Sequence, residues 1–136
     1  MEWLLPALGS LIFYGFWAFF PKMASLTINP KSFLFYNVIG SVVVNFVIFF
    51  VMKSKLQFEM KGFVFSILTG VFGILGTLLF AYALGKGKAS VVIIVTALYP
   101  IVSIILAMVF LKEVISIRQF IGMALGMVAV VLISKP

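Results

Sequence analysis

The sequence predicts an all-α integral membrane protein that crosses the bilayer as five helices. Of its 136 residues, 65% are hydrophobic and 10% are charged, and the mean hydropathy is +1.34. Soluble domains usually carry about 25% charged residues, so these charges are too few to cover a surface that faces water. Lipid tails solvate apolar side chains directly, and the composition therefore favours a membrane protein.

Five apolar runs are long enough to cross a membrane as helices. A spanning helix needs about 17 to 25 predominantly apolar residues to cross roughly 30 Å of hydrocarbon. The runs that meet this requirement cover residues 3–20, 33–52, 62–84, 89–111 and 117–133. Short polar segments such as Pro21-Lys22 and Lys112-Glu113 close them. We therefore expect a single five-helix membrane domain over residues 1–136.

Local signals for helix starts agree with these boundaries. Asn29-Pro30 has the form of an N-cap followed by proline at the first helical position, ahead of the second run. Ser116 and Gln119 have the spacing of a capping box at the start of the fifth run. Pro6 falls in the first turn of the first helix, where a missing N–H costs little.

The cations are divided equally between the two sides of the membrane. The connections after the second and fourth spans, which share a side with the N-terminus, hold Lys53, Lys55, Lys61, Lys112 and Arg118. The opposite side holds Lys22, Lys31, Lys86, Lys88 and Lys135. The positive-inside rule needs an imbalance to select an orientation, so these charges select none. Two explanations stay open: a coincidence of small numbers, or dual topology, in which copies insert both ways and pair antiparallel.

Composition also excludes several classes of function. The net charge of +7 does not predict nucleic-acid binding, because the basic residues lie in short gaps where they anchor helix ends to lipid headgroups. Without cysteine or histidine, the chain has no thiol chemistry and lacks the commonest zinc ligands. Its three carboxylates, Glu2, Glu59 and Glu113, lie outside the spans. We expect no catalytic residue, metal site or cofactor, and no proton coupling through a carboxylate at membrane depth.

Polar and aromatic residues recur at helical spacing within three of the spans. Polar groups are costly in a bilayer, so their positions are informative. The stripes are Ser10, Tyr14, Trp17 and Pro21 in the first run, Asn37, Ser41 and Asn45 in the second, and Thr96, Tyr99, Pro100 and Ser103 in the fourth. They predict either a cavity for an uncharged or zwitterionic solute or hydrogen bonds that join helices. Joining helices is favoured for Asn37 and Ser41, while both interpretations stay open for Tyr14, Trp17 and Tyr99.

A proline interrupts the fourth run at mid-span. Pro100 has no N–H, so it frees the carbonyl of Thr96 and favours a kink in the helix. We expect this kink to be a hinge or a solute contact, unless a nearby hydroxyl satisfies the freed carbonyl.

Two rows of glycine lie in the third and fifth runs. Gly70, Gly73 and Gly76 follow one another in the third run, and Gly122 and Gly126 form a small-xxx-small motif in the fifth. Glycine lets the backbone of another helix approach closely. Both rows therefore predict helix packing.

An ordered set of short segments extends through the chain. It consists of residues 14–17, residues 83–90, Tyr99-Pro100, residues 111–113, residues 119–122 and Gly126. In this order the segments resemble the EamA domain of the drug/metabolite transporter superfamily. Most members have ten helices, built from two five-helix halves of opposite orientation. The resemblance implies that this chain is one half of a ten-helix inverted-repeat transporter.

The resemblance also implies an assembly and a function. A single half needs an antiparallel copy to rebuild the cavity, which favours a dual-topology homodimer over coincidence in the charge count. Such a dimer would move a small organic solute, whether a metabolite, an amino-acid-like molecule or a drug-like one, by alternating access in a cytoplasmic-type cell membrane. The partners are then a second copy, the lipid bilayer and the solute. The alternatives are a non-transporting membrane subunit, or a lipid-carrier flippase component of a hetero-oligomer.

The same resemblance implies which residues contact the solute. In the family the cavity lies among the first, third and fourth helices of each half. Carried onto this chain, the substrate-binding residues are Tyr14, Trp17, Thr77, Thr96, Tyr99 and Ser103. Tyr82 is a weaker candidate, because it lies near the end of its span. The residues left to helix packing or to a hinge are Asn37, Ser41, Asn45, Gly70, Gly73, Gly76, Pro100, Gly122 and Gly126.

Overall fold

The computed structural model describes residues 4–52 and 56–134, and all its regular elements in these ranges are helices. In chain order they are α1 (Leu4–Ser25), α2 (Pro30–Met52), α3 (Met60–Lys86), α4 (Ala89–Thr96), α5 (Tyr99–Phe110) and α6 (Ile117–Ser134). Lys53, Lys55 and Lys135, which entered the cation count, and the carboxylate residue Glu2 lie outside the described residues. The predicted all-helical fold is confirmed.

Four helical segments of the described chain are long and apolar enough to cross a membrane. They are α1, α2, α3 and the stretch Ala89–Phe110, which contains both α4 and α5. The fifth predicted span corresponds to α6, whose apolar stretch Ile117–Leu132 is shorter than the other four. Together these helices make the chain a multi-pass membrane protein.

Side-chain caps fix where three of the helices begin. Asn29 Oδ1 accepts the amide of Ser32 at 2.9 Å, which confirms the predicted N-cap of α2. Ser116 and Gln119 form the predicted capping box of α6: the Ser116 amide donates to Gln119 Oε1 at 2.8 Å, and the Gln119 amide to Ser116 Oγ at 3.3 Å. In α3, Glu59 Oε2 accepts the Gly62 amide at 2.7 Å, a cap that the sequence reading had missed.

The first helix extends past the apolar run that predicted it. Pro21 lies inside α1, which ends only at Ser25. The last turn is held by the Ser25 hydroxyl, which donates to the carbonyl of Lys22 at 2.7 Å. Lys22 in turn donates through Nζ to the carbonyl of Leu84 in α3 at 2.9 Å, so this end of α1 is tied to α3.

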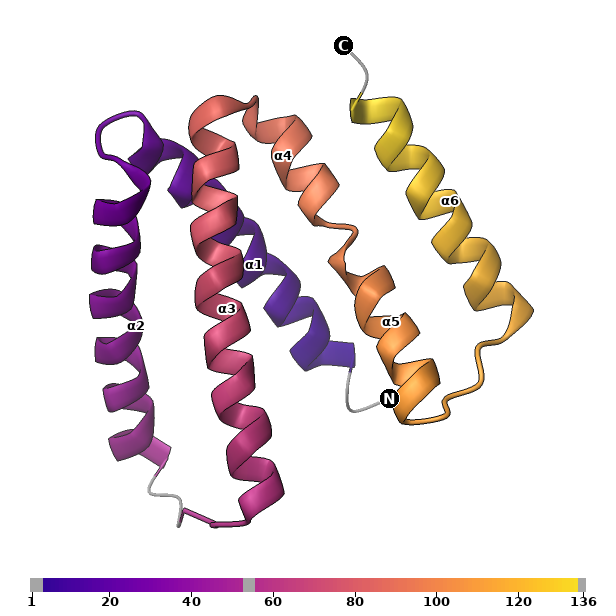
Figure 1. Ribbon diagram of the computed structural model, residues 1–136, viewed down its shortest axis with the longest axis horizontal. Helices are drawn as coiled ribbons and strands as arrows, with labels where there is room; N and C mark the ends of the chain where they lie inside the picture. The colour runs from indigo at the N-terminus through magenta and orange to yellow at the C-terminus, as the bar shows by residue number, and fades with distance from the viewer. Residues whose placement is uncertain (1–3, 53–55, 135–136) are drawn as a thin grey trace. The chain divides into compact units, whose positions relative to one another are not determined.

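The chain divides into two compact units, Met1–Lys86 and Gly87–Pro136. In the first unit, α2 and α3 form an antiparallel pair, and α1 runs obliquely across it and contacts both helices (Figure 1). The buried residues in its described part are Pro21 of α1 and, on α3, Thr77, Phe80, Ala81 and Leu84. All of them belong to the C-terminal parts of α1 and α3. The first unit is therefore packed at one end.

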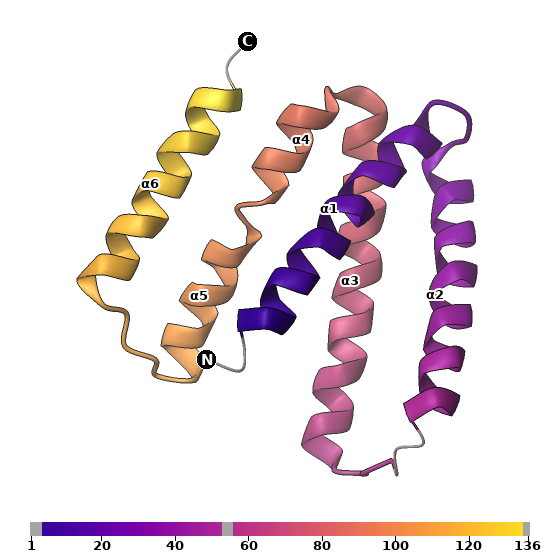
Figure 2. The ribbon, with the colours of Figure 1, turned by 180° about the vertical axis from the view of Figure 1, so that it is seen from behind.

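The second unit contains α4, α5 and α6. The α4 and α6 helices lie side by side (Figure 2). Ala97 and Leu98 separate α4 from α5, so the fourth predicted span consists of two shorter helices.

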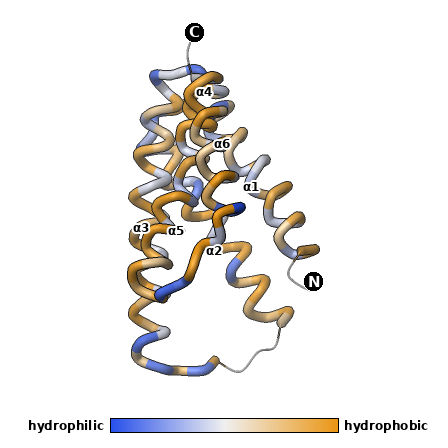
Figure 3. The backbone as a smooth tube through the Cα atoms, turned by 90° about the vertical axis from the view of Figure 1, so that its right-hand side faces the viewer, coloured by the Kyte–Doolittle hydropathy of each residue, from blue (hydrophilic) through white to orange (hydrophobic). Residues whose placement is uncertain are grey.

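Hydrophilic residues gather where helices are joined, as at the connection between α2 and α3, while the helices themselves are mostly apolar (Figure 3). The prediction of a single five-helix domain stays a prediction.

Candidate functional site

The packed end of the first unit contains two of the predicted site residues. The indole of Trp17 is stacked on the ring of Phe80, with ring centroids 5.5 Å apart and planes only 7° from parallel. Phe80 is 5% exposed and Thr77, one turn earlier on the same face of α3, is 7% exposed. Trp17 keeps 42% of its surface exposed. One face of the indole is thus packed against α3, and Trp17 and Thr77 belong to one cluster.

Phe80 is the residue that joins these two positions, and the sequence interpretation did not select it. The signal was its spacing, because Thr77, Phe80 and Leu84 recur every three or four residues along α3 and make up its buried face. The Thr77 hydroxyl donates to the carbonyl of Gly73 in its own helix at 2.8 Å. Its oxygen keeps lone pairs that can accept a further hydrogen bond.

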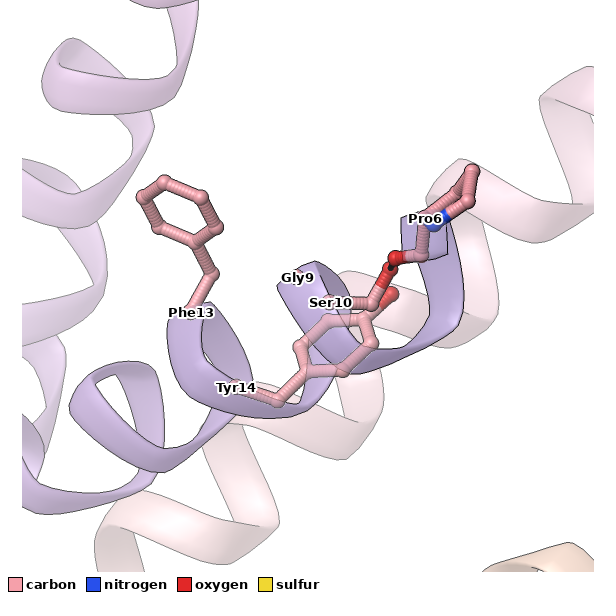
Figure 4. A pocket seen from close by; sticks show the side chains of 5 residues that line it. All are labelled: Pro6, Gly9, Ser10, Phe13 and Tyr14. Atoms are coloured by element: carbon pink, nitrogen blue, oxygen red, sulfur yellow. Dashed lines mark hydrogen bonds between the residues drawn. The ribbon is translucent and has the colours of Figure 1, made fainter. Parts of the chain in front are cut away.

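Tyr14 lies on α1 one turn before Trp17, in an exposed position. Tyr14 is 62% exposed and borders a shallow surface concavity together with Pro6, Gly9, Ser10 and Phe13 (Figure 4). The Ser10 hydroxyl there donates to the carbonyl of Pro6 at 2.9 Å. In the described chain Tyr14 therefore offers an open ring, in contrast to the packed indole of Trp17.

The polar residues of α2 bond to their own helix. The Ser41 hydroxyl donates to the carbonyl of Asn37 at 2.6 Å, and the Asn45 amide donates to the carbonyl of Ser41 at 2.8 Å. Asn37 is half-buried, whereas Ser41 and Asn45 are exposed. A role for these residues in joining α2 to another chain stays a prediction.

The fourth span is interrupted near Pro100, as the sequence predicts. Pro100 occupies the start of α5, so the break itself falls at Ala97 and Leu98. The hydroxyl of Thr96 donates to the carbonyl of Val92 at 2.8 Å, and that of Ser103 lies 3.5 Å from the carbonyl of Tyr99. Neither hydroxyl satisfies the freed carbonyl of Thr96. Tyr99 is 61% exposed.

The glycine rows are not covered by other parts of their own units. Apart from the backbone of its own helix turn and its chain neighbours, a Cβ atom placed on Gly70, Gly73 or Gly76 of α3 would meet no described atom within 4 Å, and the same holds for Gly122 and Gly126 of α6. These faces therefore have room for another helix or a solute. The predicted role of these glycines in helix packing stays a prediction.

Comparison with known proteins agrees with the fold. The model of the EamA-like transporter family matches residues 1–135. An uncharacterized protein of the archaeon Methanocaldococcus jannaschii is 30% identical over 123 residues, which make up 90% of this chain and 89% of that protein. No solved structure matches the chain. The family match covers nearly the whole sequence, and the chain therefore belongs to the EamA-like transporter family.

Proposed function

We propose that this chain carries a small organic solute across a cytoplasmic-type cell membrane by alternating access, as an antiparallel homodimer. Membership of the EamA-like transporter family supports transport. The observation that carries the proposal is the uneven packing of the first unit. Among the described residues of this unit, the buried ones belong to the C-terminal parts of α1 (Pro21) and of α3 (Thr77, Phe80, Ala81 and Leu84), and α2 has no buried residue.

A bundle that is packed at one end exposes the inner faces of its helices at the other. The segments of α1 and α2 away from the packed end carry exposed hydroxyl, amide and phenol groups, such as those of Ser10, Tyr14 and Asn45. Polar groups at membrane depth are stable when they face a water-filled cavity or another chain, and costly when they face lipid. A second copy of the chain would enclose these faces and leave a polar space between the two bundles.

The side chains of this space suit an uncharged or zwitterionic solute. Tyr14 and the free face of the Trp17 indole offer aromatic surfaces for stacking. Acidic residues are absent from the spans in the sequence, so this solute is not selected by a buried carboxylate.

The equal division of the ten cations supports an antiparallel pair. Because the chain has no cysteine, Lys55→Cys and Lys86→Cys are clean reporters of opposite sides. Each variant is treated in intact cells with a membrane-impermeant maleimide. Partial labelling at both positions is expected, because copies would insert in both directions. Labelling at one position only would fix the orientation, refute the antiparallel homodimer and direct attention to a hetero-oligomeric partner.

A further inference from the structure

Three lysines lie at the packed end of the first unit. Lys22 is in the last turn of α1, Lys86 is in the last turn of α3, and Lys31 is in the first turn of α2. The connection between α1 and α2 and the C-terminal end of α3 lie at the same end of this unit in both views (Figure 1, Figure 2). Lys22 Nζ donates to the carbonyl of Leu84, two residues before Lys86, so the ends of α1 and α3 are held together. We call these three lysines the basic end.

The acidic side chains of the sequence are all on the opposite side of the predicted spans. Glu2 precedes the first span, Glu59 lies between the second and third, and Glu113 lies between the fourth and fifth. The five cations on that side are therefore accompanied by three carboxylates, whereas the five on the side of the basic end are accompanied by none. The positive-inside rule weighs mainly the cations, so this difference leaves the orientation open. It does decide which end attracts an anion.

The carboxylate of Glu59 is too distant to offset the basic end. Glu59 directly precedes α3, and Lys86 is its last residue. The 27 residues of α3 correspond to about 40 Å of helix. The Debye length at physiological ionic strength is about 8 Å. The positive charge of the basic end is therefore not reduced by the acidic end of the same unit.

Two tyrosines place the basic end at the level of the lipid headgroups. Tyr82 lies one turn before Lys86 and is 40% exposed, and Tyr36 lies five residues after Lys31 and is 60% exposed. Tyrosine is enriched at the interface of membrane and water, where the ring contacts apolar groups and the hydroxyl contacts water. Lys31 and Lys86 lie closer to the ends of their helices than these rings. Their ammonium groups therefore extend to the level of the phosphates.

The three lysines have different surroundings. Lys22 is half-buried and bonded to α3, whereas Lys31 and Lys86 are exposed. An ammonium group is a point charge that binds phosphate through charge-assisted hydrogen bonds. Lys31 and Lys86 are the residues that can contact a phosphate, while Lys22 fixes the helix ends that carry Lys86 and adds its charge.

We propose that the basic end binds the phosphate of an anionic phospholipid, with Lys31 and Lys86 as the contact residues. A headgroup with a net negative charge is favoured over phosphatidylcholine, because choline would bring a further cation to a site that already holds three. The site lies within the first unit, so this inference goes beyond the proposed function and depends neither on the solute nor on the antiparallel pair. In an antiparallel homodimer the two copies would present one such site to each leaflet.

Native mass spectrometry of the full chain, released from detergent micelles, tests the proposal. The protein is titrated with an equimolar mixture of phosphatidylglycerol and phosphatidylcholine that have the same acyl chains. We expect the first lipid retained to be phosphatidylglycerol. A lysine near an anionic lipid surface contributes about a fivefold factor in affinity, so Lys31→Gln/Lys86→Gln should lower the apparent affinity for this lipid at least fivefold.

Two further variants control for fold and for total charge. Lys61→Gln/Lys112→Gln removes two cations from the opposite side, each within two residues of a carboxylate. It should change the affinity by less than about twofold, because these lysines are screened from the basic end. Lys31→Arg/Lys86→Arg keeps both charges and should keep the preference for phosphatidylglycerol. Circular dichroism compares the helix content of all the variants.

The proposal is supported if the preference is lost in Lys31→Gln/Lys86→Gln and kept in the other two variants. Equal binding of the two lipids by the unmodified chain, equal losses in both glutamine variants, or an unchanged affinity in Lys31→Gln/Lys86→Gln would overturn it. Displacement of the lipid by excess inorganic phosphate would assign the site to a free anion and overturn the assignment to a lipid. Neither labelling nor transport is measured, so the result is independent of the topology experiment that tests the proposed function.

Discussion

The stack between Trp17 and Phe80 gives a measurable energy that joins α1 to α3. We consider the changes Trp17→Leu and Phe80→Leu, alone and together, which keep an apolar side chain at each position and remove the ring pair. An aromatic pair contributes about 0.5–1.5 kcal/mol beyond its burial, and 1.4 kcal/mol is about a tenfold change in an equilibrium constant. With centroids at 5.5 Å and nearly parallel planes, we expect a coupling energy of about 1 kcal/mol.

The coupling is measured as a double-mutant cycle from reversible unfolding in mixed micelles, followed by circular dichroism. Phe72→Leu is the matched control, because Phe72 lies on the same helix and is 69% exposed. The change in unfolding free energy caused by Phe72→Leu should add to that of Trp17→Leu within about 0.5 kcal/mol. If Trp17 and Phe80 are additive to the same extent, the stack does not hold the first unit together, and the packed end must depend on other contacts.

Three further predictions use the same unfolding measurement or a binding assay. Lys22→Met should destabilise the chain by about 1–2 kcal/mol, because it removes a hydrogen bond from an ammonium to the carbonyl of Leu84. The control is Lys31→Met at an exposed position, which should change stability by less than about 0.5 kcal/mol. Equal losses of stability in the two variants would show that the hydrogen bond from Lys22 to α3 does not account for the effect of Lys22→Met. Asn29→Ala should cost about 1 kcal/mol, since it removes the cap on the Ser32 amide, and Asn29→Asp should restore most of it. Tyr99→Ala should abolish solute binding while changing stability by less than about 0.5 kcal/mol, because the ring is 61% exposed; retained binding would remove Tyr99 from the site.

Features set by a few neighbouring residues were predictable from the sequence. The caps at Asn29 and Ser116 depend on side chains that reach amides three residues later, and such spacing is visible in the sequence. The spans were visible because lipid imposes a length and a composition on every crossing helix. Glu59 could have been found in the same way, since it lies three residues before the amide that it caps.

Contacts between helices were not predictable to the same extent. Lys22 and Leu84 are 62 positions apart, yet an ammonium and a carbonyl lie 2.9 Å from each other. Trp17 was selected for its polar stripe, but its stack on Phe80 depends on the angle at which α1 crosses α3. In a span that is apolar on all sides, hydropathy does not indicate which face is buried. Partners across helices therefore came from the structure alone.

Two prolines with the same chemistry have different consequences in this chain. Pro21 and Pro100 each deprive the carbonyl four residues earlier of its amide. The helix continues through Pro21, close to the end that Lys22 ties to α3. At Pro100 the amides of Leu98 and Ile101 also shift to carbonyls three residues earlier, so two more acceptors lose their donors. Proline alone predicts one free carbonyl in either helix. In the fourth span this rearrangement divides the helix into α4 and α5, whereas α1 stays continuous from Leu4 to Ser25.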